Sequence, residues 1–298
     1  MIMKPSTYLF TTNRLAYKQT ISALATLTNL FGFSPAKIIS RHDDPCQAAV
    51  GTATSNHSLQ KIGEYCATLQ VDVNEMTNLN MPKALLMADM DATIIRGESL
   101  DELAKLAGIG PEIARITARA MAGELDFEEA LSARLSLLAG QDANLLDKVI
   151  GNTVITEGAA SLLATMRGHG HHAYLVSGGF AFLTAHVSEK LNFTGHRANQ
   201  MGIKKGRLSG EIVPPLLDKS AKARIFSELC HSHGISGENV IAVGDGANDI
   251  EMLTQAGLGV AFEGKPALRE HVSVQLSYSD LSALLYLQAY DRDSFITP

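Results

Sequence analysis

The chain has 298 residues, 46% of them hydrophobic, with 25 Lys and Arg against 31 Asp and Glu. A chain of this length buries enough apolar surface to fold without disulfides or a structural metal, and about two domains are expected. The net charge of −6 argues against nucleic acid or an anionic membrane as the main partner, and the apolar stretches are too short to span a bilayer.

The cysteines and the first residues indicate where the protein works. Cys46, Cys66 and Cys230 are widely spaced and odd in number, which is typical of reduced thiols and not of a disulfide framework or a zinc site. Residues 1–13 turn polar before an apolar core develops, so they make a poor signal peptide. We therefore expect a cytoplasmic protein that acts on a small molecule. The oligomeric state stays open, and a homodimer is compatible with the sequence.

The first part of the chain, residues 1–80, has a mixed α+β pattern. Residues 71–73 alternate as a strand does, and a polar connector containing a proline follows over 74–82. The apolar run 84–88 then predicts a buried parallel strand. We therefore expect a boundary near residue 80, between an N-terminal region over 1–80 and a second domain over 81–298.

In the second part, short apolar runs alternate with helical patterns. The runs predict strands at 84–88, 173–176, 240–243 and 258–262, and the patterns between them predict helices at 181–190, 220–233 and 249–256. This alternation is typical of a doubly wound α/β domain with helices on both faces of a parallel sheet. A hairpin is expected where 198–203 and 207–213 flank Lys204, Lys205 and Gly206.

An insertion at about 99–155 follows the first core strand and is almost wholly helical. Ser99 and Glu102 have the spacing of a capping box, and apolar residues recur at helical intervals further on. The insertion therefore predicts a small helical bundle that forms a cap over the sheet.

Two aspartates stand directly after the first core strand, where open α/β sheets bind their ligands. Asp89 could act as a covalent nucleophile toward phosphorus, and Asp91 could give a proton to the leaving group and later take one from water. Two carboxylates this close repel each other unless a cation is present. Helix capping or a solvated turn would explain the pair equally well if it stood alone.

Later motifs add the groups that phosphoryl transfer needs. Ser177 and Gly178 offer a hydroxyl and a backbone amide to an anion, and Lys222 offers an ammonium. Asp245 and Asp249 follow the third core strand and suit Mg²⁺, a hard cation that prefers oxygen ligands. Each motif taken singly has a plain structural explanation, such as a tight turn or a solvated lysine.

One further glycine-rich stretch is rejected as a site. Residues 259–265 have the glycine and lysine spacing of a phosphate-binding P-loop, but Pro266 stands where a serine or threonine should bind the metal. The stretch also ends a late strand instead of opening the domain. We interpret it as a turn.

The order and content of the accepted motifs resemble the haloacid dehalogenase (HAD) superfamily over about residues 83–290, and within it the phosphoserine phosphatase family. The resemblance rests on 89–93 followed by Glu98, on the cap segment 120–129, on 177–180 and on 244–249. It implies a HAD-like Rossmannoid core and a Mg²⁺-dependent hydrolase. The reaction would convert O-phospho-L-serine to L-serine and phosphate through an aspartyl-phosphate, as the last step of serine biosynthesis. Position 92 is Ala where many relatives carry Ser.

The same resemblance implies a role for each site residue. Asp89 would be the nucleophile and Asp91 the general acid and base, and both would hold Mg²⁺ together with Asp245, with Asp249 supporting. The substrate would be bound by Glu98 at its ammonium, Arg134 at its carboxylate, Ser177, Gly178 and Lys222 at its phosphoryl group, Asn248 as a positioning residue, and Met121 and Phe127 as closing residues of the cap. An acid, a guanidinium and a metal with a lysine match the three charged groups of phosphoserine.

Two alternatives stay open. The same chemistry could serve another small phosphomonoester, or transfer the phosphoryl group to an acceptor such as homoserine. The protein could also be mainly an amino-acid sensor, with 1–80 as a regulatory, ACT-like module, because some relatives carry a small ligand-binding βαββαβ module in this position.

Overall fold

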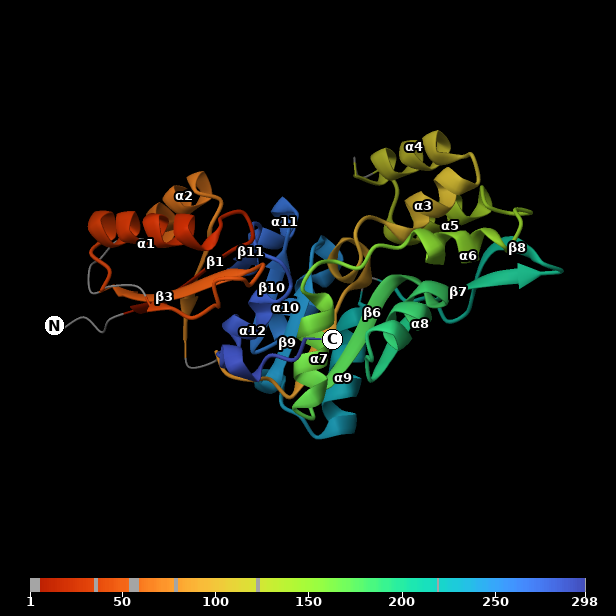
Figure 1. Ribbon diagram of the computed structural model, residues 1–298. Coiled ribbons are helices and arrows are strands. Elements are labelled where there is room, and N and C mark those ends of the chain that lie inside the picture. The colour runs from red at the N-terminus through yellow and green to blue at the C-terminus, as the bar shows by residue number, and fades with distance from the viewer. Residues whose placement is uncertain are drawn as a thin grey trace.

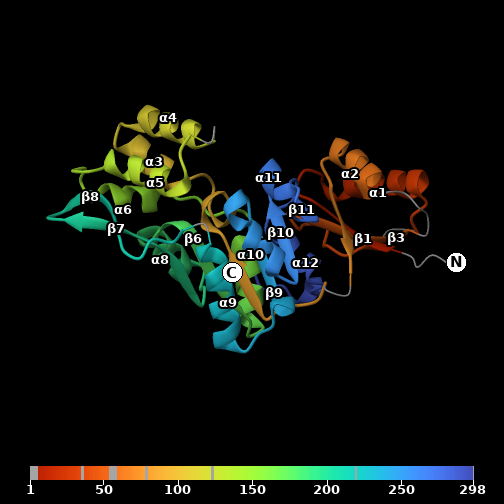
Figure 2. The ribbon, with the colours of Figure 1, turned by 180° about the vertical axis from the view of Figure 1, so that it is seen from behind.

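The computed structural model describes the chain over 6–34, 37–53, 59–77, 80–121, 124–218 and 220–297. Figure 1 shows an N-terminal unit at one end, a central body, and a group of helices above the other end. The view from behind in Figure 2 shows the same separation. The N-terminal unit and the helical group therefore lie on opposite sides of the central body.

The N-terminal unit has the element order βαββαβ. Its elements are β1 (Ser6–Thr12), α1 (Tyr17–Phe31), β2 (Lys37–Ile38), β3 (Gln47–Ala53), α2 (Leu59–Thr68) and β4 (Asp72–Met76). The strands form an antiparallel sheet in the order β2-β3-β1-β4. Alternate residues of β1 face opposite ways: Tyr8 and Phe10 pack with α1 and α2, whereas Leu9 joins the core of the central body.

The central body is built on a mostly parallel sheet, which confirms the predicted α/β class. The strands run in the order β11-β10-β9-β5-β6-β7-β8, and β8 alone among the described strands of this sheet is antiparallel to its neighbour. Their bounds are β5 (Leu85–Ala88), β6 (His172–Phe180), β7 (Gly195–Lys204), β8 (Arg207–Val213), β9 (Val240–Gly244), β10 (Leu258–Phe262) and β11 (Val274–Leu276). The predicted strands and the predicted hairpin are all present.

Helices cover both faces of this sheet because its inner strands are apolar on both sides. Leu86 and Ala88 of β5 pack on the face that carries α7 (Ala159–Gly168), α8 (Ala181–Lys190) and α12 (Ala283–Leu287). Leu85 and Met87 pack on the face that carries α9 (Ala221–His233), α10 (Ile250–Gln255) and α11 (Pro266–Arg269). All four β5 side chains are fully buried, as expected for a central parallel strand.

The helical group is the cap that follows β5 in the chain. It consists of α3 (Ser99–Leu106), α4 (Gly110–Met121), α5 (Phe127–Ser136) and α6 (Leu145–Asn152). The two linkers that join it to the body lie side by side, because Ile95 bridges to Ile155 and the Arg96 N–H donates to the Val154 carbonyl at 2.9 Å. These paired linkers form the hinge of the cap, which also contacts the β7–β8 hairpin, where the Gly140 N–H donates to the Leu208 carbonyl at 2.9 Å.

The capping box predicted at Ser99 and Glu102 is wrong. Glu98 occupies the N-cap position of α3, and Ser99 is already helical. The Ser99 N–H and hydroxyl donate to Asp91 at 2.9 and 3.1 Å, so the hydroxyl is used for a tertiary contact and not for the helix end.

The N-terminal unit docks on the edge of the central sheet through side chains. The Asn74 amide of β4 donates to the Gln275 carbonyl and accepts from the Gln275 N–H, at 3.0 and 2.9 Å, as a neighbouring strand would. Asp72 accepts from the N–H groups of Ser277 and Tyr278 at 2.8 and 3.0 Å. These contacts satisfy the exposed edge that β11 would otherwise present.

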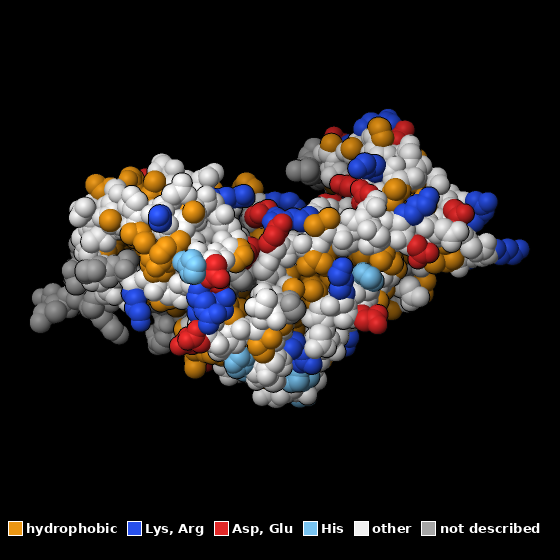
Figure 3. Space-filling view, in the orientation of Figure 1, with side chains coloured by type: hydrophobic (Ala, Val, Ile, Leu, Met, Phe, Trp, Pro, Cys, Tyr) orange, Lys and Arg blue, Asp and Glu red, His pale blue; other side chains and the backbone are white. Residues whose placement is uncertain are grey.

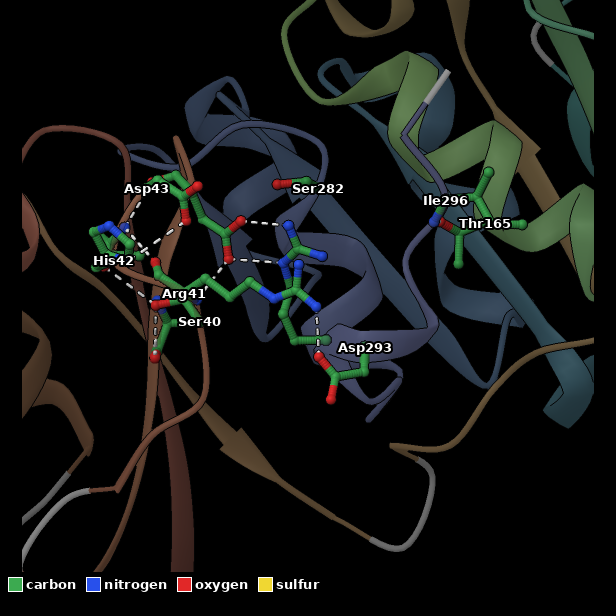
Figure 4. Close-up of polar contacts among 12 residues, drawn as sticks. Ser40, Arg41, His42, Asp43, Thr165, Ser282, Asp293 and Ile296 are labelled. Carbon is green, nitrogen blue, oxygen red and sulfur yellow. Dashed lines mark hydrogen bonds and ion pairs between the residues drawn. The ribbon is translucent and has the colours of Figure 1, made fainter.

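Two ion pairs join the loop before β3 to the last part of the chain (Figure 4). Arg292 donates to both carboxylate oxygens of Asp44, and their side chains are only 18% and 8% exposed. Arg41 lies 2.6 Å from Asp293, but these side chains are 54% and 82% exposed. Figure 4 also shows Ile296, whose N–H donates to the Thr165 hydroxyl at 2.9 Å.

Within the described residues, no helix is long and apolar enough to cross a membrane.

The buried Arg292–Asp44 pair should stabilise the fold far more than the exposed Arg41–Asp293 pair. We expect Arg292→Met to lower the free energy of unfolding by about 3 kcal/mol, because the Asp44 carboxylate stays buried without its partner. Arg41→Met is the matched control and should cost less than about 1 kcal/mol, because exposed pairs contribute little. Urea denaturation at neutral pH measures both changes.

The stabilisation by the Asp44–Arg292 pair should depend on pH. Burial opposes the ionisation of Asp44, but hydrogen bonds from Arg292 and the Arg41 backbone outweigh it and hold the pKa of Asp44 below its ordinary value. The stabilisation is therefore present above an unfolded-state pKa of about 3.9 and is lost as pH falls through the lowered pKa. A stability gap between wild type and Arg292→Met that stayed constant down to about pH 2 would contradict this explanation.

Candidate active site

Asp89 is the first residue after β5 and is held at the carboxyl edge of the sheet. Its N–H donates to the Val243 carbonyl of β9 at 3.0 Å, and its carboxylate accepts the Met90 N–H at 2.8 Å. The chain then turns sharply over Met90–Ile94, where Ala92 adopts a left-handed conformation with φ of 52°. This turn brings Asp91 back toward the same edge.

Lys222, near the start of α9, lies between two buried carboxylates. Its Nζ is 2.7 Å from Asp89 Oδ1 and 2.5 Å from Asp249 Oδ1. Burial disfavours the ammonium, yet the two carboxylates outweigh burial and raise the pKa of Lys222. Burial and the negative charge of Asp249 raise the pKa of Asp89, and Lys222 opposes that rise. The three side chains therefore form one buried, ion-paired cluster.

Asp249 is fully buried and is already well supplied with donors. Besides the Lys222 ammonium, it accepts the N–H groups of Asp245 and Gly246 at 3.1 and 3.0 Å. Its carboxylate therefore fixes the loop that follows β9 and orients Asp245 at the edge of the cavity.

Asp91 lies in a setting that suits proton transfer. Burial and the negative charge of Glu98 raise its pKa to about 7, although Ser99 donates two hydrogen bonds to its carboxylate. A carboxyl group with a pKa near neutrality can both donate and accept a proton at physiological pH.

The Ser177–Gly179 loop forms because β6 leaves its regular pairing with β7 between Val176 and Phe180. The Gly179 N–H donates to the Ser177 hydroxyl at 2.8 Å. A Cβ at Gly179 would lie 2.7 Å from Asp91 Oδ2, so only glycine fits this close approach. Asn199 supports the loop from β7, because its amide donates to the Gly178 carbonyl at 2.9 Å.

These groups surround a cavity of 160 Å³ between the sheet edge and the cap. Of the residues selected from the sequence, the cavity is lined by Asp89, Asp91, Glu98, Arg134, Ser177, Gly178, Asp245 and Asn248. Figure 3 shows the molecule hollowed between the cap and the N-terminal unit, with acidic and basic side chains gathered along the hollow. Lys222 and Asp249 do not line the cavity, and they lie beneath it against Asp89.

Glu98 and Arg134 come to the cavity from the two sides of the cap. Glu98 ends the hinge before α3, and burial raises its pKa. Arg134 lies in the last turn of α5, where its Nε donates to the Ala130 carbonyl at 3.2 Å, and burial lowers its pKa. The side chains of Met121 and Phe127 lie outside what the structure describes.

Several lining residues were given no role in the site by the sequence analysis: Ser99, Leu100, Leu131, Gly179, Phe180 and Lys265. Lys265 belongs to the stretch interpreted as a plain turn, and it does precede the short helix α11 as a turn residue would. Its Nζ, however, is 2.9 Å from Asp245 Oδ2 and 3.6 Å from Glu98 Oε1. Asn199 was also missed, and a polar residue inside the first strand of the predicted hairpin was the available signal.

The acidic residues form a group that could hold a metal ion. In the described part of the chain, carboxylate oxygens of Asp89, Asp245 and Asp249 lie within 4.8 Å of one another. Oxygen-only donors of this kind suit a hard divalent cation. The Lys265 ammonium on Asp245 marks a position beside this group where a positive charge is already favourable.

Comparison with known proteins gives a family and several relatives. A family model described as haloacid dehalogenase-like hydrolase matches residues 86–254. A phosphoserine phosphatase from Archaeoglobus fulgidus is 40% identical over 216 residues, which is 72% of this chain and 63% of that protein. A phosphoserine phosphatase from Methanocaldococcus jannaschii is 37% identical over 203 residues, which is 68% of this chain and 96% of that protein.

A solved structure extends the likeness to nearly the whole fold. A HAD family hydrolase from Salmonella enterica superposes with a TM-score of 0.84 at 26% identity, covering 95% of this chain and 98% of that one. The matched segment spans 63% of the Archaeoglobus protein and 51% of two further phosphoserine phosphatases. Because the family model covers more than half of the chain, and the Methanocaldococcus relative is matched along almost its whole length, the chain belongs to the haloacid dehalogenase-like hydrolases.

Proposed function

We propose that this protein is a Mg²⁺-dependent phosphoserine phosphatase, which hydrolyses O-phospho-L-serine to L-serine and phosphate in the last step of serine biosynthesis. The observation that carries the proposal is the single cavity in which Asp89, Asp91, Glu98 and Arg134 meet. It combines a nucleophile and a proton donor with one acid and one guanidinium for an amino acid. The curated relatives that match the chain are named for the same activity.

The first half of the reaction uses both aspartates. An Asp89 carboxylate oxygen attacks phosphorus and forms an acyl-phosphate bond, while the bond from phosphorus to the serine oxygen breaks. Asp91 gives its proton to the departing alkoxide, so L-serine leaves neutral at that oxygen. Support comes from the pKa of Asp91, which at about 7 keeps a proton available near neutral pH.

The second half regenerates the enzyme. Asp91, now ionised, takes a proton from a water molecule, whose oxygen attacks phosphorus. The acyl-phosphate bond breaks and the electron pair returns to the Asp89 carboxylate, so phosphate leaves. Lys222, 2.7 Å from Asp89, keeps a positive charge beside the phosphoryl group in both halves.

The metal would be held by Asp89, the backbone carbonyl of Asp91 and Asp245, with Asp249 in a supporting position. Bound Mg²⁺ would neutralise the negative charge of the carboxylate and the phosphoryl oxygens. The supporting role of Asp249 agrees with its geometry, since its oxygens already accept from Lys222 and two backbone N–H groups.

Substrate selection would use charged groups on both sides of the hinge. Glu98 would bind the ammonium of phosphoserine and Arg134 its carboxylate, because a guanidinium can donate two parallel hydrogen bonds to a carboxylate. Ser177, Gly178 and Lys222 would hold the phosphoryl group, with Asn248 positioning it. Met121 and Phe127 would close the cap over the substrate.

Asp89→Asn should abolish turnover. An amide cannot form the acyl-phosphate, so we expect kcat on O-phospho-L-serine to fall by at least about 10⁴-fold. Phosphate release measures the loss. Asp147→Asn, on the exposed side of α6, is the matched control and should keep wild-type kcat. Retained turnover by Asp89→Asn would refute the aspartyl-phosphate.

Arg134→Ala should separate recognition from chemistry. Loss of the guanidinium removes the partner of the substrate carboxylate, so kcat/KM on O-phospho-L-serine should drop about 100-fold. An aryl phosphate has no such carboxylate and should lose less than about threefold. Arg115→Ala, an exposed change in the same cap, serves as control. Equal losses on both substrates would count against the proposed role.

Metal dependence and substrate choice can be measured together. Activity should require added Mg²⁺, vanish on chelation and return when Mg²⁺ is restored, since the acidic group would otherwise repel the substrate phosphate. A panel of phosphomonoesters, assayed with and without homoserine, compares hydrolysis with phosphoryl transfer. Little activity on phosphoserine would favour another phosphomonoester as the substrate. Faster transfer to homoserine than to water would favour a phosphotransferase.

A further inference from the structure

Lys265 is a cation at the mouth of the cavity that the proposed reaction does not use. Its ammonium contacts Asp245, a proposed metal ligand, at 2.9 Å and Glu98, the proposed acceptor of the substrate ammonium, at 3.6 Å. Lys222, by contrast, is engaged beneath the cavity by Asp89 and Asp249. Lys265 therefore links two carboxylates that would serve two different ligands.

The backbone of Lys265 is firmly held. Its N–H donates to the Asp245 carbonyl at 2.8 Å, and its own carbonyl accepts the Leu268 N–H at 3.0 Å. Two residues earlier, Glu263 pairs with Arg96 of the cap hinge at 3.0 Å. Pro266 follows as the first residue of α11. The point from which the side chain starts is thus fixed on the metal-binding side of the cavity.

The Lys265 side chain is open to solvent. It is 58% exposed, whereas the carboxylate of Asp245 is only 8% exposed. A lysine stem has four flexible carbons, and its ammonium is readily rehydrated. The ammonium can therefore leave both carboxylates for solvent at small cost when another cation takes its place.

We propose that Lys265 is a resident counter-ion, which neutralises Asp245 and Glu98 while the site holds no ligand and is displaced by the divalent cation and by the ammonium of the amino acid. This inference rests on the proposed function. Lys265 then lowers the affinity for both ligands, because each must replace an existing ion pair and remain near a positive charge. Weaker binding of L-serine would favour release of the product.

The proposal predicts that removing the Lys265 charge tightens Mg²⁺ binding, whereas removing a residue that supports the metal site would weaken it. Mg²⁺ is titrated calorimetrically into the full-length protein in the absence of substrate. Lys265→Met keeps the stem but removes the charge, and should lower the Kd for Mg²⁺ by about tenfold. Lys265→Arg keeps the charge and should stay within about twofold of wild type. Lys190→Met removes an exposed lysine at the end of α8 and controls for net charge. Its Kd for Mg²⁺ should also stay within about twofold of wild type.

A second measurement follows the amino-acid side of the cavity. Inhibition of phosphoserine hydrolysis by L-serine should become about threefold stronger in Lys265→Met and unchanged in Lys265→Arg, since the weaker contact is the one to Glu98. If Lys265 only held the loop in place, Lys265→Met would instead bind both Mg²⁺ and L-serine more weakly.

The outcomes separate this inference from the proposed function. Equal or weaker Mg²⁺ binding by Lys265→Met, in a protein whose wild type binds Mg²⁺ and hydrolyses phosphoserine, overturns the inference alone. If Lys265→Met binds Mg²⁺ more tightly than wild type, but the wild-type protein does not hydrolyse phosphoserine, the counter-ion role is supported and the substrate assignment is overturned. Absence of Mg²⁺ binding by the wild type overturns both.

Discussion

The ion-pair cluster of Lys222 with Asp89 and Asp249 is the constraint on which the site depends. Two carboxylates are buried, one directly after β5 and one in the loop that follows β9, and burying a charge is costly unless it is paired. One ammonium from α9 pairs with both carboxylates, at 2.7 and 2.5 Å. The cluster thereby ties a helix on one face of the sheet to two loops at its edge. Those loops carry the residues that face the cavity, so ion pairing and site geometry have the same physical origin.

The arrangement also explains how two neighbouring aspartates can differ. Asp89 is held beside the Lys222 ammonium, which opposes the rise in its pKa that burial and the negative charge of Asp249 cause. Asp91 is turned toward Ser99 and Glu98, where burial and a like charge raise its pKa to about 7. Left-handed Ala92, between the turn and the hinge, lets the chain fold back tightly enough for both environments to exist two residues apart. Environment, and not residue type, thus distinguishes the two aspartates for which we propose different roles.

The N-terminal unit is joined to the body more closely than a tethered module would be. Leu9 and Ala48 belong to the same hydrophobic core as α12, and Asn74 and Asp72 complete the edge of the central sheet. Its βαββαβ order is the one that an ACT-like module would have, and the regulatory role of 1–80 stays a prediction. The unit also reaches the cap hinge through loops, because Asn13 bonds to Asp280, the Leu281 N–H donates to the Glu157 carbonyl, and Glu157 pairs with Arg96.

The sequence alone determined the inner strands of the central sheet, the inserted cap and most of the residues around the cavity. Parallel strands are buried on both faces, so they appear as apolar runs, and polar residues directly after such runs must meet at one sheet edge. Tertiary structure alone decided the roles of Ser99, Asn199 and Lys265. The Ser99 hydroxyl had a local alternative in helix capping, and Asn199 and Lys265 act on residues that are distant in the chain. Such contacts depend on which segments the fold brings together, and no spacing along the chain records that.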